Sequence, residues 1–149
     1  MVKYRGPDDS PCACRSLVTE ARVDNLHEVL GFVSDYLEVL DCPPKIRMQM
    51  DIAVEELFVN IAHYAYPDGT GKAEIRLRSS QDPKTVEIEL RDSGIPYDPT
   101  KNEDPDVTLA AEDRDIGGLG VFMVRQYTDG FTYRYENGQN ILTIRRIIE

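Results

Sequence analysis

The sequence is poor in three features, and each shortage excludes a class of protein. Its three cysteines are an odd number in 149 residues, too few for the disulfide framework of a small secreted domain. The 17 Lys and Arg residues are outnumbered by 27 Asp and Glu, for a net charge of −10, which argues against sequence-independent binding to nucleic acid or anionic lipid. The chain has no apolar run near the roughly 20 residues that span a bilayer, and no apolar signal segment within residues 1–20. We therefore expect a cytoplasmic protein with reduced thiols, no membrane contact and no direct contact with nucleic acid.

The cysteines leave a metal site open as an alternative. Cys12 and Cys14, with Cys42 and a histidine, could supply four zinc ligands. However, a Cys-x-Cys spacing is unusual for structural zinc, and no second paired motif follows. Ordinary thiols are the preferred interpretation.

The sequence is otherwise that of a globular protein, and its acidic residues are unevenly distributed along the chain. Hydrophobic residues make up 41% and charged residues 30%, as is typical of a folded domain. We expect a flexible lead-in over residues 1–13 and one domain over residues 14–149. Between Asp92 and Asp115 there are eight acidic and two basic residues, a net of −6. A proline-containing loop of this length is usually functional or disordered.

Hydrophobic periodicity predicts the secondary structure. Asn25 and Glu28 are expected to form a capping box at the start of the first helix, and Leu119, Phe122 and Tyr127 share an apolar face of the third helix with Met123. The predicted elements are a strand (14–20), two helices (25–40 and 44–65), a hairpin (73–79 and 85–91), a long loop, a helix that follows a glycine-rich turn at 117, and two strands (131–135 and 141–148).

Strands that cluster in hairpins favour one class of fold over another. The predicted order is β-α-α-β-β-loop-α-β-β, in which strands do not alternate singly with helices. This order predicts an α+β fold, a two-layer α/β sandwich with a mixed, mostly antiparallel sheet and helices on one face, rather than a doubly wound parallel sheet.

Three glycines stand where the third helix is predicted to begin, namely Gly117, Gly118 and Gly120. Glycine lets backbone N–H groups approach an anion closely, and a helix N-terminus adds a favourable partial charge for phosphate. The cluster fits neither GxxxxGK[ST] nor GxGxxG. Taken alone, it is better explained by a tight turn.

The second predicted helix contains Glu56 and, four residues later, Asn60. This spacing puts both side chains on one face, where a carboxylate and a carboxamide could accept a proton and bind a hard cation. The alternative is that both lie on a solvated face. An Asn in mid-helix among apolar residues favours a specific role, because Asn is a mediocre helix former.

A third segment follows the predicted hairpin, where Asp92 is followed by Gly94. An aspartate at a strand end can accept a hydrogen bond from an exocyclic amine, and a glycine leaves room for a flat ring. As an isolated motif, however, this segment is better explained as a simple turn.

Taken together and in this order, the three segments resemble the N, G1 and G2 boxes of the GHKL ATPase superfamily, which has the Bergerat fold. The closer resemblance is to its RsbW-like branch, the anti-sigma factors and serine/threonine kinases of bacterial partner-switching systems. The similarity covers about residues 14–148. The matching stretches are 53–60 with 64–67, 92–99 and 117–124.

This resemblance implies a role for each matching residue. Asn60 would bind Mg²⁺ and Glu56 would be the general base. Asp92 would accept a hydrogen bond from the adenine amino group of ATP, with Gly94 packed near the ring. The backbone N–H groups that would bind the phosphates belong to Gly117, Gly118 and Gly120.

The same resemblance identifies the acidic loop, about residues 98–116, as an ATP lid. Because its acidic residues cannot bind phosphate, we expect the lid to be mobile without nucleotide and its acidic face to point to solvent or to a partner. Arg114 could still reach the phosphates, although in similar kinases an arginine often stands directly before the glycines. Here two residues intervene.

The function implied is that of an ATP-binding anti-sigma regulatory factor with serine/threonine kinase activity toward a STAS-type antagonist. When free, such a protein binds a sigma factor or another regulated target, and the branch also suggests a homodimer. Two alternatives remain open, a nucleotide-gated protein-binding module without significant kinase activity and a domain that binds no nucleotide.

Overall fold

The computed structural model describes residues 14–101 and 116–149, so the predicted lead-in and most of the predicted lid, including Arg114, lie outside the described residues. The elements follow the predicted order. They are β1 (Arg15–Glu20), α1 (Leu26–Val39), α2 (Pro44–Asn60), β2 (Lys72–Ser80), β3 (Thr85–Asp92), α3 (Ile116–Tyr127), β4 (Gly130–Glu136) and β5 (Gln139–Ile147), with three short helical turns, η1 (Val23–Asn25), η2 (Ile61–Ala65) and η3 (Pro99–Lys101).

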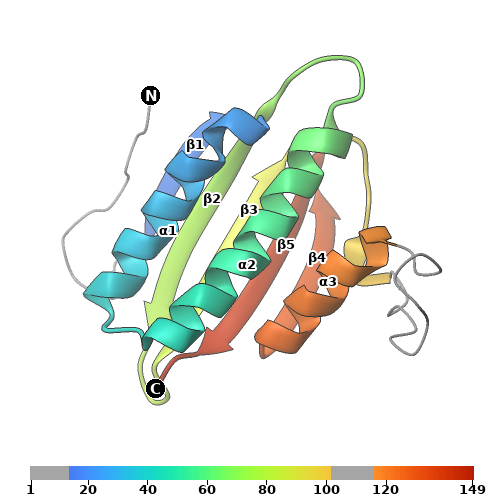
Figure 1. The fold of residues 1–149 in the computed structure, drawn as a ribbon. Coiled ribbons are helices and arrows are strands. Elements are labelled where there is room, and N and C mark those ends of the chain that lie inside the picture. Colours follow the sequence, from blue (N-terminus) through green and yellow to red (C-terminus); the bar gives the residue numbers. More distant parts are fainter. Residues whose placement is uncertain (1–13, 102–115) are drawn as a thin grey trace.

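The strands form one sheet in the order β1-β2-β3-β5-β4, and each described pairing is antiparallel. The three long helices lie side by side on one face of this sheet, with α2 in the middle (Figure 1). The two-layer α+β arrangement predicted from the hairpins is confirmed. In the described part of the chain, no helix is both long enough and apolar enough to cross a bilayer.

The core lies between the sheet and the helices. Alternate residues of the central strands point toward α1 and α2, so that Ile75, Leu77, Ile88 and Leu90 are fully buried. Full burial of such a side chain contributes roughly 1.5–3 kcal/mol. The helices supply the facing side chains, which include Val29, Val33, Leu37, Met50, Val54, Leu57 and Phe58.

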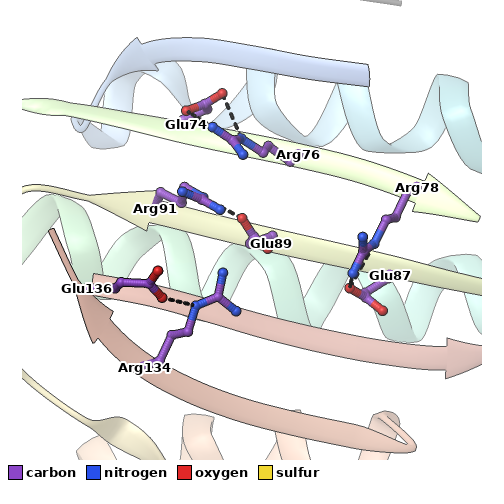
Figure 2. Close-up of polar contacts among 8 residues, drawn as sticks. All are labelled: Glu74, Arg76, Arg78, Glu87, Glu89, Arg91, Arg134 and Glu136. Atoms are coloured by element: carbon purple, nitrogen blue, oxygen red, sulfur yellow. Dashed lines mark hydrogen bonds and ion pairs between the residues drawn. The ribbon is translucent and has the colours of Figure 1, made fainter. Parts of the chain in front are cut away.

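The opposite face of the sheet carries charge (Figure 2). Arg78 of β2 forms a cross-strand ion pair with Glu87 of β3. Three other pairs join residues two apart in one strand, Glu74 with Arg76, Glu89 with Arg91, and Arg134 with Glu136. Solvent-exposed pairs contribute about 0–1 kcal/mol each, so the pairs at Arg78 and Arg134 mark a polar face more than they stabilise the sheet, whereas the Glu89–Arg91 pair is largely buried.

The predicted capping box is wrong. Asn25 makes no side-chain hydrogen bond to the start of α1, and its amide donates instead to the backbone oxygen of Glu20 at 3.0 Å. The turn η1 precedes α1 without a break, so Asn25 does not stand at a free helix end. Oε1 of Glu28 is buried without a hydrogen-bond partner.

Two further differences concern the helices α2 and α3, which carry two of the three matching stretches. The second predicted helix is α-helical only to Asn60 and continues as one π-helical turn, η2. Among the α3 residues from 120 onward, whose burial the structure describes, Val121 and Val124 are buried, whereas Phe122, Met123 and Tyr127 of the predicted face are only half-buried and the side chain of Leu119 lies outside the described part. A small residue, Gly120, lets this side of α3 approach α2 closely.

Candidate functional site

The residues singled out in the sequence come from three elements, of which α2 packs against α3 and the loop after β3 is hydrogen-bonded to the turn that follows α2. Glu56 and Asn60 lie on α2, Asp92 ends β3, and Gly94 follows it. Gly120 lies in α3, which packs against α2. The glycine cluster is part of the helix itself, because α3 begins at Ile116, so the expectation that a turn opens the helix is corrected.

Glu56 and Gly120 are in direct contact. A Cβ added to Gly120 would lie 1.9 Å from Oε1 and 2.0 Å from Cδ of Glu56. Any side chain at this position would therefore displace the carboxylate. A packing requirement from Glu56 explains the glycine at 120.

The surroundings of Glu56 change its acidity. The side chain is half-buried, and its pKa is raised, first by desolvation and second by the negative charge of the neighbouring Glu55. A carboxylate of raised pKa is a better proton acceptor near neutral pH than a solvated one.

Asn60 lies one turn after Glu56 and is also half-buried. It is the last residue of α2, and the π-helical turn begins directly after it. Such turns are frequent at functional sites. Among the described residues there is no group of three or more His, Cys, Asp and Glu side chains that could hold a metal alone. A single carboxamide oxygen nevertheless suits Mg²⁺, which often takes one or two protein ligands together with substrate phosphates.

Asp92 is buried, with 4% of its surface exposed. Its Oδ1 accepts hydrogen bonds from the backbone N–H of Gly94 and from the Asn140 amide, both at 2.9 Å. Burial raises the pKa of this carboxyl, and the two hydrogen bonds partly oppose that rise. No hydrogen bond from the described residues reaches Oδ2, which keeps its capacity to accept one.

The segment after Asp92 is fixed to the end of the second helix. The N–H of Ile95 donates to the backbone oxygen of Ala65 at 2.9 Å. A Cβ on Gly94 would lie only 2.2 Å from that same oxygen. The approach of two backbones therefore requires glycine at 94, which is more than a simple turn needs.

Two residues of this site were given no role from the sequence, Tyr66, which lies within the matching stretch 64–67, and Asn140, which was not singled out at all. Tyr66 accepts a hydrogen bond from the N–H of Ser93 at 2.8 Å and donates one to the oxygen of Lys72 at 2.6 Å. Asn140, on β5, is 4% exposed and contacts both Asp92 and the loop after it. Asn140 alternates with the buried Leu142 and Ile144 along the strand, which was a usable signal of a buried side chain, but its partner depends on the strand register.

Comparison with known proteins identifies the family of the domain. A family model described as the histidine kinase-like ATPase domain matches residues 19–146. The chain is similar to the serine/threonine-protein kinase BtrW of Bordetella bronchiseptica, with 28% identity over 100 residues that cover 67% of this chain and 70% of that protein.

Solved structures share the fold. The SiaB–SiaC complex from Pseudomonas aeruginosa contains a chain with a TM-score of 0.57 and 16% identity, and the match covers 89% of both chains. The blue-light activated histidine kinase of Erythrobacter litoralis EL346 matches with a TM-score of 0.52 and 19% identity. That match covers 83% of this chain and 42% of the kinase, so this chain spans less than half of that protein.

Proposed function

The chain belongs to the histidine kinase-like ATPase domain family, and on that premise we propose that residues 14–149 form one ATP-binding domain that phosphorylates serine or threonine on a partner protein. The observation that carries the proposal is the contact between Glu56 and Gly120. This contact places a carboxylate of raised pKa beside the helix whose first residues include the glycine cluster.

The nucleotide would be held at two ends of the site. At the adenine end, Oδ2 of Asp92 accepts a hydrogen bond from the amino group of the ring, and the loop at Gly94 lies beside the ring. At the phosphate end, the backbone N–H groups of Gly117, Gly118 and Gly120 bind the phosphates. Arg114 is proposed to add positive charge there.

Glu56 is proposed as the general base. Its carboxylate accepts the proton of the partner's hydroxyl group while the hydroxyl oxygen bonds to the γ-phosphorus and ADP leaves with the electrons of the broken bond. The carboxamide oxygen of Asn60 would hold Mg²⁺, which offsets negative charge on the phosphates when bound. Reaction then depends on positioning and electrostatics, with no covalent enzyme intermediate.

The proposed partner is a STAS-type antagonist, as in the partner-switching systems that the motifs resemble. The relative BtrW is named a serine/threonine-protein kinase, and SiaB was solved in complex with SiaC. Both names support a protein substrate for this chain. We further propose that the protein, when it is free of the antagonist, binds a sigma factor or another regulated target, and that it forms a homodimer.

Binding and transfer are tested separately with Glu56→Gln. Thermal unfolding with Mg-ATP at 100 times its Kd should show a gain of about 2.7 kcal/mol, or roughly 5–10 °C, for both wild type and variant. Transfer of labelled phosphate to a STAS protein from a neighbouring reading frame should fall by about 10²–10⁴ in the variant, as expected when a general base is lost. An unmoved Tm of the wild type at millimolar Mg-ATP would contradict the proposed site.

A second function, a nucleotide-gated binding module, is favoured by the position of Arg114. Two residues separate it from the first glycine of the cluster. The module is the better description if wild type binds Mg-ATP but transfers no phosphate to the STAS protein.

A further inference from the structure

Asn140 lies beside Asp92, the aspartate that is proposed to bind the adenine ring. In the antiparallel pairing of β3 with β5, it lies directly opposite Asp92. Both side chains are 4% exposed, and they are joined by a hydrogen bond of 2.9 Å between buried groups. A buried polar pair of this kind must satisfy its own hydrogen bonds or lose stability.

The orientation of the Asn140 amide is determined by its surroundings. Its Oδ1 accepts from the backbone N–H of Tyr97 at 3.1 Å and from the hydroxyl of Tyr133 at 2.6 Å. Its Nδ2 donates to Asp92 Oδ1 and to the backbone oxygen of Ile95, both at 2.9 Å. A flipped amide would set NH₂ against an N–H and oxygen against two oxygens, so only one orientation is compatible with these neighbours.

This orientation decides what Asp92 can offer to a ligand. With Asn140 and the N–H of Gly94 both donating to Oδ1, the oxygen left for a ligand is Oδ2. Two donated hydrogen bonds favour the ionised carboxylate over the protonated acid. An ionised carboxylate only accepts hydrogen bonds. It therefore accepts a hydrogen bond from an amino group, whereas a carbonyl oxygen in the same place would be repelled.

Adenine and guanine differ in that respect, because the 6-position of the ring carries an amino group in adenine and a carbonyl oxygen in guanine. We propose that Asn140 is a positioning residue that sets the selectivity of this site for adenine over guanine nucleotides, by keeping Asp92 ionised with Oδ2 as its free acceptor. This inference rests on the proposed binding of the purine base by Asp92.

Asn140→Asp tests the inference with almost no change in shape. It replaces the donating Nδ2 by an oxygen, and two carboxylates this close to one another cannot both be ionised, so the pair takes up a proton. With that proton on Oδ2 of Asp92, this oxygen donates a hydrogen bond to a carbonyl oxygen. Asn137→Asp is the matched control, because it adds the same charge in the exposed turn between β4 and β5, three residues away.

The measurement is the dissociation constant of Mg-ATP and of Mg-GTP by calorimetry. For Asn140→Asp we expect the ratio of the GTP constant to the ATP constant to fall by about tenfold or more, equivalent to about 1.4 kcal/mol, and Asn137→Asp should keep the wild-type ratio. A purely structural role would weaken both nucleotides equally, so an unchanged ratio in a folded variant would overturn the inference.

Tyr133→Phe provides an independent variant if Asn140→Asp does not fold. It removes one of the two hydrogen bonds that Oδ1 of Asn140 accepts and leaves the one from the N–H of Tyr97, and we expect the ratio to fall by about threefold. An unchanged ratio in Tyr133→Phe would then overturn the inference. Failure of the wild type to bind either nucleotide would instead overturn the proposed function, and the role of Asn140 with it.

Discussion

Glu56 on α2 and Gly120 on α3 lie in contact, and a Cβ on the glycine would come within 1.9 Å of the carboxylate oxygen Oε1. The two helices therefore cannot come closer together at this point without moving the proposed base. A requirement for glycine in α3 thus arises from α2, at a helix position where alanine would otherwise be preferred.

Gly120→Ala should reduce phosphate transfer while leaving the fold intact. The new methyl group displaces the flexible end of Glu56, and in a proton-transfer site a misplacement of about 1 Å can cost about 10²-fold in rate. Alanine also raises helix propensity by up to about 1 kcal/mol, which offsets part of the strain. The measurements are the rate of phosphate transfer and the Tm of the same sample.

Gly31→Ala is the control for that variant. Gly31 lies in α1, and an added Cβ would meet nothing within 4 Å. It should raise the free energy of unfolding by up to about 1 kcal/mol and leave the transfer rate unchanged. Equal rates in both variants would contradict the role given to the Glu56–Gly120 contact.

Gly94→Ala should be destabilising and should weaken nucleotide binding. Its Cβ would meet the backbone oxygen of Ala65 at 2.2 Å, and a backbone atom cannot move aside as a side chain does. We expect a loss of about 1–3 kcal/mol, measured by denaturant unfolding. In Gly69→Ala, where the added Cβ meets nothing within 4 Å, the change should stay within about 0.5 kcal/mol.

Asp92→Asn should stabilise the nucleotide-free protein near neutral pH. Because burial raises the pKa of Asp92 in the folded state, the folded form binds more protons than the unfolded form in the window above the ordinary pKa of 3.8. Stability is therefore lost as pH rises through that window. The Asn side chain keeps an oxygen that can accept from Gly94 and Asn140 and removes the charge.

We expect a Tm about 2–4 °C above wild type at pH 7.5, corresponding to about 1 kcal/mol, and a vanishing difference at pH values below 3.8, where both side chains are neutral. Binding of Mg-ATP should be lost in the variant. Asp35→Asn, on the exposed side of α1, is the control and should leave Tm unchanged. A gain in Tm that persists at low pH would show that the charge is not its cause.

Tyr66→Phe should loosen the segment after β3 without removing the aromatic ring. The lost hydroxyl bridges the N–H of Ser93 and the oxygen of Lys72, and the ring still covers Gly71. We expect a loss of about 1 kcal/mol and faster hydrogen exchange at the Ser93 amide. Tyr64→Phe, at a tyrosine that is 66% exposed, should change neither quantity.

The order of elements and the two-layer fold were predictable because they depend on local signals. Alternating residues such as Ile75 and Ile88 identify strands that are buried on one face, and Asn137-Gly138 predicts the turn in which both residues have the positive φ angles observed, 52° and 75°. The pairing of neighbouring strands into hairpins then follows from short connections.

Features that depend on distant partners were not predictable. The buried face of α3 is set by the close approach at Gly120, so periodicity alone did not indicate Val121 and Val124. The capping box failed because a preceding helical turn occupies the position where Asn25 would cap. The candidate site residues were chosen from the spacing of the motifs, and the roles assigned to them stay predictions. Asn140 was missed because its partner is 48 residues away in the sequence.

The position of β5 has a consequence for the folding pathway. This strand is C-terminal to every other described element, yet it pairs with β3 on one side and β4 on the other, inside the sheet. During synthesis, β3 emerges well before the strand that carries Asn140, and pairings between such distant segments form slowly. The proposed purine site is thus completed among the last events in the folding of this sheet, so a fluorescent nucleotide would detect molecules in which β5 has paired with β3 and would not detect partly folded ones.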